Sequence, residues 1–155
     1  MSEFKFTAII LGNNTANELK KTLNSIINQT LNFNENIEVI IIDNNTNYVQ
    51  NIFNNDYAEN IKCFESDSPI AANIGLENAN GNYLIFLHAN DYLSEDTLEN
   101  ALNLIENDKN LDLIALPIYY YKNGRKERYL DYIIDENGIF DLNKNLYFFI
   151  IIFII

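Results

Sequence analysis

Short apolar segments alternate with amphipathic helical segments along the first two thirds of this chain, and this alternation constrains the fold most strongly. Phe4 to Leu11 and Ile37 to Ile42 are rich in β-branched residues and stop at polar residues, which is typical of buried strands. From Thr15 to about Gln29, apolar residues recur at helical spacing, and Thr15 with Glu18 forms a capping box. Strand, helix and strand in this order predict a mostly parallel sheet.

The same alternation continues as far as about residue 110. We expect a helix over Tyr48 to Tyr57, a strand over Asn60 to Phe64, a helix from Pro69 closed by Asn80-Gly81, a strand over Tyr83 to Leu87, and a helix opened by Ser94. The chain is therefore predicted to be one α/β domain with helices on both faces of the sheet.

Beyond Leu111 the pattern becomes antiparallel. The segments Leu113 to Tyr121 and Lys126 to Ile134 flank Asn123-Gly124, a strong hairpin signal. The last ten residues, 146–155, are apolar or aromatic, and ten residues are too few to cross a bilayer as a helix. We expect these residues to be buried in the sheet, against a partner protein or a second copy of this chain, or in a longer parent domain of which this chain is a part. We thus divide the domain into an α/β part (1–110), a hairpin region (111–145) and an apolar tail (146–155).

Composition excludes several classes of protein. With 155 residues, of which 48% are hydrophobic, the chain can bury a core, so disorder is excluded. A net charge of −12 argues against nucleic acid as a partner. The lone Cys63 can form no disulfide within the chain, and the first residues lack the features of a signal peptide. We expect a cytoplasmic location, with peripheral attachment to the inner face of the membrane left open.

Three polar loops follow the predicted parallel strands, at Gly12 to Asn14, Asp43 to Thr46 and His88 to Asp91. The carboxyl ends of parallel strands meet at one edge of a sheet, where ligands of such folds bind. The sequence therefore predicts a binding site at this edge.

These loops and their flanking segments resemble the nucleotide-binding half of family 2 glycosyltransferases, which have the glycosyltransferase-A fold. The resemblance rests on the segments ILGNN (10–14), LKKTLNSIINQT (19–30), EVIIIDNNT (38–46) and SPIAANIGLENANGNYLIFLHANDYL (68–93). It implies a Rossmann-like domain, truncated relative to the family, which transfers a sugar from a nucleotide sugar to a glycan or glycoconjugate during polysaccharide synthesis. A uridine diphosphate sugar is the favoured donor.

By this resemblance, the nucleotide would contact residues of all three loops and of the helix after Pro69, namely Asn14, Asp43, Asn44, Asn73 and His88. Family members hold Mn²⁺ or Mg²⁺ with an Asp-Xaa-Asp motif, and the cation stabilises the leaving nucleoside diphosphate. The corresponding metal ligands here would be His88, Asn90 and Asp91. Each residue also has a purely structural interpretation: Asp43 could cap a helix near Thr46, and Asp91 the helix near Ser94.

The departures from the family pattern concern the chemistry. The two acids of the motif align with His88 and Asn90, the signature Arg with Ala72, and the second acid of the ribose loop with Asn44. An amide supplies only a dipole to a cation, so metal binding is expected to be weakened. A degenerate fold that serves as a non-catalytic binding or assembly module, docking through its apolar tail, is the alternative hypothesis.

The remaining candidates have ordinary structural explanations. The family's general base lies in a second half of the domain that this chain does not reach, so no base is assigned among Asp131, Asp135, Glu136 and Asp141. Cys63 is expected to be a core residue. The basic cluster is expected to be a solvated hairpin tip, and its members are Lys122, Arg125, Lys126 and Arg128.

Overall fold

A computed structural model describes most of the α/β part and, beyond it, four short segments that form strands. The described residues are 4–12, 15–44, 52, 59–68, 70–108, 113–116, 119–122, 125–128 and 150–154. The expected helix over Tyr48 to Tyr57 lies outside them, except for Ile52. None of the helices in the described ranges is long and apolar enough to cross a bilayer.

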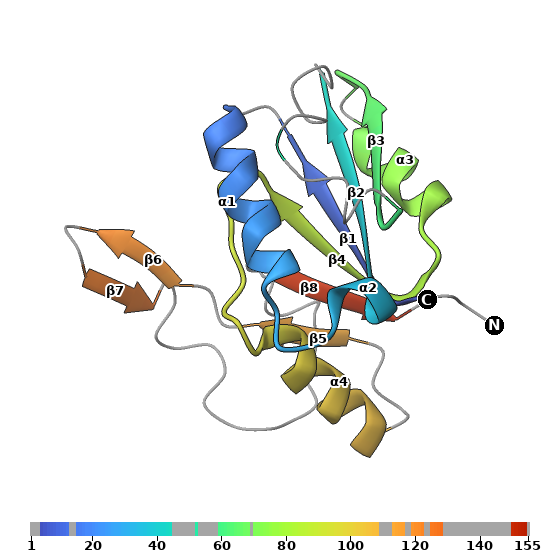
Figure 1. The fold of residues 1–155 in the computed structure, drawn as a ribbon. Helices are drawn as coiled ribbons and strands as arrows, with labels where there is room; N and C mark the ends of the chain where they lie inside the picture. The colour runs from blue at the N-terminus through green and yellow to red at the C-terminus, as the bar shows by residue number, and fades with distance from the viewer. Residues whose placement is uncertain are drawn as a thin grey trace, which may run out of the picture.

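A six-stranded sheet with the order β3-β2-β1-β4-β8-β5 forms the centre of the molecule (Figure 1). Its strands are β1 (Phe4–Leu11), β2 (Ile37–Asp43), β3 (Ile61–Glu65), β4 (Gly81–His88), β5 (Leu113–Leu116) and β8 (Ile150–Ile154). β1 pairs in parallel with both β2 and β4, and β2 pairs in parallel with β3. The mostly parallel sheet expected from the sequence is confirmed.

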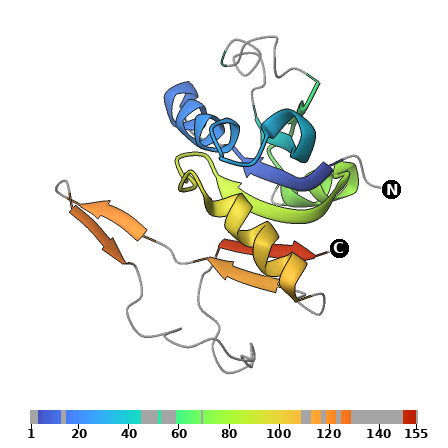
Figure 2. The same ribbon diagram turned by 60° about the horizontal axis from the view of Figure 1, so that its bottom comes forward.

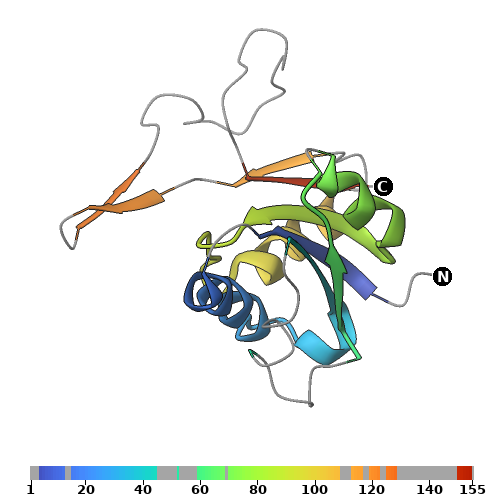
Figure 3. The same cartoon turned by 90° about the horizontal axis from the view of Figure 1, so that it is seen from above.

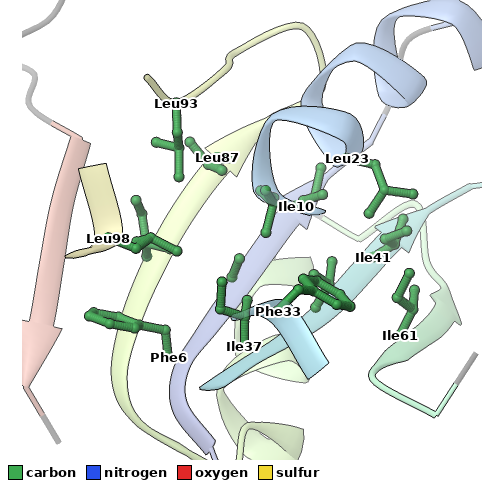
Figure 4. Close-up of a cluster of buried hydrophobic side chains, with 14 of the residues drawn as sticks. Phe6, Ile10, Leu23, Phe33, Ile37, Ile41, Ile61, Leu87, Leu93 and Leu98 are labelled. Carbon is green, nitrogen blue, oxygen red and sulfur yellow. The ribbon is translucent and has the colours of Figure 1, made fainter. Parts of the chain in front are cut away.

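Helices cover both faces of this sheet (Figure 3). One face carries α1 (Ala16–Ile27), α2 (Phe33–Asn36) and α4 (Thr97–Asn107), and the other carries α3 (Ala71–Asn78). On the first face, Leu23 of α1 and Leu98 of α4 belong to one apolar cluster with Phe6, Ile10 and Ile41 of the strands (Figure 4). Strands buried on both faces explain why the sequence of β2 is almost continuously apolar.

The apolar tail contributes β8 to the same sheet. β8 pairs antiparallel with β4 on one side and with β5 on the other (Figure 2). From the sequence, this tail could have been buried in several ways. The structure shows that its residues 150–154 are a strand of the chain's own sheet. Docking of the tail on a partner was considered because its burial was unknown, and pairing within the sheet removes that reason.

The hairpin region divides differently from the prediction. The segment expected to run from Leu113 to Tyr121 comprises two strands, because β5 belongs to the main sheet whereas β6 (Tyr119–Lys122) pairs antiparallel with β7 (Arg125–Arg128). Lys122 lies opposite Arg125, as a two-residue Asn-Gly connection requires. The hairpin signal is thus confirmed for residues 119–122 and 125–128, whereas residues 129–134 of the predicted second strand lie outside the described residues.

Two helix boundaries differ from the prediction. The helix expected to open at Ser94 begins at Thr97, with Asp96 as its N-cap residue. The helix expected to close at Asn80-Gly81 ends at Asn78, and Gly81 is the first residue of β4. A Cβ atom at Gly81 would lie 2.5 Å from the backbone nitrogen of Thr7, so close approach of β1 explains this glycine. The capping box of Thr15 and Glu18 is confirmed.

A buried carboxylate joins β2 to its neighbours near the amino ends of the strands. Glu38 is 1% exposed and accepts hydrogen bonds from the Thr7 hydroxyl (2.8 Å), Lys62 Nζ (2.5 Å), and the backbone N–H and Nδ2 of Asn80 (2.9 and 2.8 Å). Burial by itself would raise the pKa of Glu38. The hydrogen bonds from Lys62, Asn80 and Thr7 outweigh burial and hold its pKa below the ordinary value. The acid in an otherwise apolar strand is therefore structural.

Candidate functional site

The polar loops begin at one edge of the sheet. Three backbone hydrogen bonds extend the strand pairing there: Gly12 N–H to the Ile42 carbonyl (2.7 Å), Ala89 N–H to the Leu11 carbonyl (3.0 Å), and Ser66 N–H to the Asp43 carbonyl (3.0 Å). The chain leaves β1 toward β2 and β3 and returns on the other side of β1 as β4. The carboxyl ends of β1 and β4 therefore mark a topological switch point, where open α/β sheets bind ligands.

Asp43, the last residue of β2, lies beside Gly12 at this edge. It is 1% exposed, and a Cβ atom at position 12 would fall 2.0 Å from Asp43 Oδ2. The carboxylate thus occupies the space that any other residue at position 12 would fill.

Asn44 and Asn73 belong to two other segments near the same edge of the sheet. Asn44 follows Asp43 directly and is exposed. Asn73 is exposed in the first turn of α3, which begins after the carboxyl end of β3. Its neighbour Gly75 packs against the sheet, since a Cβ atom there would lie 2.5 Å from Ile9 Cγ2. Asn14 and Thr46 lie outside the described residues.

The third loop follows β4 and holds the positions of the degenerate motif. His88 and Asn90 are exposed, and Ala89 between them is buried. Asn90 has φ 88°, a left-handed conformation that Asn and Asp tolerate better than other non-glycine residues. Backbone conformation therefore gives Asn90 a structural role that is independent of any ligand.

Asp91 stabilises its own loop. Its Oδ2 accepts a hydrogen bond from the His88 N–H at 3.1 Å, and its backbone N–H donates to the His88 carbonyl at 2.9 Å. The expectation that Asp91 caps the next helix is wrong, because that helix begins at Thr97 with Asp96 as its N-cap residue. Asp91 thus supports the turn in which His88 and Asn90 lie.

The donor atoms for a cation are few in this loop. Among the described residues, no three His, Cys, Asp or Glu side chains are grouped closely enough to hold a metal ion. His88, Asn90 and Asp91 together supply one imidazole, one amide and one carboxylate, so a single full negative charge would face a cation. These residues could contribute to a metal site, but they would leave half of the charge of a divalent cation to be neutralised by the bound diphosphate.

The sequence analysis missed two contributions to this edge of the sheet. Gly12 was predicted only as part of a polar loop, although its lack of a side chain makes room for Asp43. Buried and partly buried polar residues in and just after α1 were not considered at all. Their spacing in the sequence, Thr22-Ser25-Gln29, is an i, i+3, i+7 pattern and could have been noticed.

The residues given ordinary explanations behave accordingly where they are described. Cys63 is half-buried, and burial raises the pKa of its thiol to about 11, which makes it a poor nucleophile. Arg125 is exposed on β7. The four acids considered for the general base lie outside the described residues, and they are Asp131, Asp135, Glu136 and Asp141.

Comparison with known proteins agrees with this architecture. The model of the family described as Glycosyl transferase family 2 matches residues 7–155. The minor teichoic acid biosynthesis protein GgaB of Bacillus subtilis (strain 168) is 32% identical over 149 residues, which are 91% of this chain and 16% of that protein. The chain thus spans a small part of this relative's length.

Solved structures show the same fold. S. aureus TarS 1–349 in complex with UDP-GlcNAc has a TM-score of 0.66 and 25% identity, covering 79% of this chain and 36% of that one. Mannosyltransferase PcManGT from Pyrobaculum calidifontis, in complex with GDP-Man and Mn²⁺, has a TM-score of 0.59 and 21% identity, covering 72% and 34%. The resemblance identified from the sequence is confirmed.

Proposed function

Because the chain belongs to glycosyl transferase family 2, we propose that it is the nucleotide-binding part of a glycosyltransferase, which transfers a sugar from a nucleoside-diphosphate sugar to a glycan or glycoconjugate acceptor. The observation that carries the proposal is the placement of Asp43 and His88 at the same edge of the sheet, on the two strands that flank β1. Neighbouring strands lie about 4.8 Å apart, so these two strand ends are roughly 10 Å apart across the switch point.

The base or ribose of the donor is assigned to the end of β2. Asp43 supplies a carboxylate that accepts hydrogen bonds from hydroxyl or imide groups, and the exposed Asn44 adds an amide. Asn14, which lies outside the described residues, and Asn73 on α3 are proposed to complete this side. Uracil is the proposed base, since TarS was solved with UDP-GlcNAc.

The diphosphate is assigned to the loop after β4. A divalent cation bound there would neutralise charge that develops on the leaving nucleoside diphosphate. Asp91 would contribute the full charge, and His88 and Asn90 the neutral ligands. Mn²⁺ is the cation to test first, because PcManGT was solved with Mn²⁺ and because imidazole is a poor ligand for Mg²⁺.

The acceptor is proposed to be a cell-surface polymer of the teichoic acid type. This proposal rests on the name of the Bacillus relative, which matches 91% of this chain. A cytoplasmic location remains a prediction, which fractionation of cells into cytosol and membranes would check.

Isothermal titration calorimetry tests donor binding directly. We expect saturable binding of UDP-GlcNAc or UDP, tighter with Mn²⁺ than without it. The double variant H88D/N90D should increase the effect of Mn²⁺ on affinity by about tenfold or more, because two carboxylates replace two neutral ligands. The variant D91N should decrease it. No heat with uridine or guanosine nucleotides, with and without Mn²⁺, would contradict the proposal.

A second candidate function, a non-catalytic binding module, is favoured by one observation. The described residues hold no group of three His, Cys, Asp or Glu side chains that could bind a metal ion, and His88 and Asn90 replace the two acids of the motif. This candidate predicts that UDP-GlcNAc binds but is neither transferred nor hydrolysed. Measurement of UDP release with and without a teichoic acid acceptor distinguishes the two, and release that depends on acceptor would exclude the second.

A further inference from the structure

We propose that Thr22 and Ser25 of α1, together with Gln29 just beyond the C-cap residue of that helix, are positioning residues, which fix the shape of the loop between β4 and α4 and thereby the affinity for the diphosphate. The inference rests on the proposed function in one respect, namely that this loop faces the diphosphate. The hydrogen bonds that carry it are independent of any ligand.

Thr22 holds the loop at the degenerate motif. Its side chain is fully buried, and its Oγ1 accepts a hydrogen bond from the Asn90 N–H at 2.8 Å. The same hydroxyl donates to the Glu18 carbonyl of its own helix at 3.3 Å, which orients the lone pairs toward the loop. Asn90 is the residue with φ 88°, so this bond is made at the point where the backbone is least favourable.

Ser25, one helical turn later, holds the next part of the loop. Its Oγ accepts from the Leu93 N–H at 3.1 Å and donates to the Thr22 carbonyl at 2.7 Å. Leu93 is 7% exposed, and its side chain lies beside Leu87 of β4 (Figure 4). The loop is therefore anchored by a backbone hydrogen bond and by an apolar side chain at the same residue.

Gln29 holds the end of the loop. It is 7% exposed; its Nε2 donates to the Ser94 carbonyl at 2.7 Å and to the Ser25 carbonyl at 2.9 Å. Its Oε1 accepts from the Leu98 N–H at 2.9 Å, in the first turn of α4. One amide thus satisfies backbone groups on both sides of the start of that helix.

The three residues form one device because each of them binds backbone groups of the same loop or of the helix start that follows it. Together they bind three backbone N–H groups and one carbonyl of residues 90–98. These partners lie 65 to 69 residues away in the sequence. Buried polar side chains in a helix interior cost stability unless their hydrogen bonds are satisfied, and here the bonds go to the loop.

The device contains no charged group. Its bonds are made to backbone atoms, so they are insensitive to which side chains stand at His88 and Asn90. Loss of the motif acids therefore leaves the supporting hydrogen bonds in place, and the loop keeps a defined conformation.

The test compares Thr22→Val with Thr30→Val. Valine keeps the volume of Thr22 but removes the acceptor for Asn90. Thr30 is a matched control because its hydroxyl donates to the Glu99 side chain at 2.6 Å and not to the loop backbone. Thr22→Ser keeps the hydroxyl and should restore the wild-type behaviour.

Two readouts separate positioning from general stability. In ligand-free protein, we expect hydrogen exchange of the Asn90 amide, followed by NMR, to rise about tenfold in T22V and to stay unchanged in T30V and T22S. In titrations with Mn²⁺, the ratio of UDP affinity to uridine affinity should fall several-fold in T22V alone, because uridine does not reach this loop.

The outcomes distinguish this inference from the proposed function. If wild-type protein binds neither UDP nor uridine, the proposed function fails, while the exchange measurement still decides whether Thr22 holds the loop. Unchanged Asn90 exchange in T22V overturns the inference. Faster exchange with an unchanged affinity ratio shows that Thr22 is merely structural and also overturns it. If T22V does not fold, Ser25→Ala with Leu93 exchange takes its place.

Discussion

Replacing Glu38 by Gln tests the physical account of the buried carboxylate. All four groups that contact Glu38 are hydrogen-bond donors, contributed by Thr7, Lys62 and Asn80. A glutamine of the same size offers one acceptor oxygen and one NH₂ group, and the NH₂ group would face donors. The Thr7 hydroxyl can reverse and accept from the NH₂ group, but Lys62 and Asn80 can only donate, so one or two hydrogen bonds to a charged group are lost in either orientation of the amide.

The expected destabilisation follows from these contacts. Hydrogen bonds to charged groups contribute about 1.5 to 3 kcal/mol each. The Lys62 side chain is 42% exposed, so solvent screens its interaction with Glu38. We therefore expect E38Q to lower the free energy of unfolding by about 3 kcal/mol. For a chain of this size that corresponds to a decrease in Tm of about 6 to 12 °C. Urea unfolding at pH 7 measures the change, with Glu77→Gln on the exposed face of α3 as the control.

The pH dependence provides a second measurement. The pKa of folded Glu38 lies below its ordinary value of 4.5, so its contribution to stability is complete above the pKa of the unfolded chain. This contribution disappears as the pH falls through the folded pKa, because the carboxylate is then protonated. The difference in stability between wild type and E38Q should thus shrink below about pH 4.5. A difference under about 1 kcal/mol at pH 7, or one that does not depend on pH, would refute the reasoning.

Three further predictions concern backbone positions. Gly81→Ala should destabilise by about 2 to 3 kcal/mol, because its Cβ atom would lie 2.5 Å from the Thr7 backbone nitrogen; a wild-type urea midpoint would contradict this. Gly12→Ala should lower nucleotide affinity in calorimetry with a smaller loss of Tm than G81A, since Asp43 Oδ2, a side-chain atom, must move; unchanged affinity would count against a role for Asp43. Asn90→Val should lose about 1 to 3 kcal/mol to strain at φ 88°, whereas Asn90→Gly should be at least as stable as wild type in thermal unfolding; equal stability of both variants would be inconsistent with the strain.

The strands and the main helices could be predicted because their signals are local. β2 is apolar along almost its whole length, and α1 carries both its apolar period and its capping box in consecutive residues. The end of α3 and the start of α4 were misplaced because contacts distant in sequence are made there, with β1 at Gly81 and with Gln29 at Ser94 and Leu98. Gly81 was interpreted as a helix terminator because glycine often ends helices. In the structure it lies against the backbone of β1. The apolar tail gave no indication of its partner strands.

The candidate site divides in the same way. The order of polar loops after apolar strands was sufficient to place Asp43 and His88 at one edge, because parallel strands bring their carboxyl ends together whatever their side chains. Whether those side chains are exposed depends on residues distant in sequence: Asp43 is buried, whereas His88 is not.

The sequence by itself determined the fold class, the family and the edge of the sheet at which a ligand would bind, since hydrophobic period and loop order are properties of neighbouring residues. The tertiary structure alone decided that Gly12 makes room for Asp43, that β8 enters the sheet, and that α1 holds the loop after β4. Each of these depends on packing and hydrogen bonds between residues about 30 to 70 positions apart, and a linear pattern carries no information on which distant groups will meet.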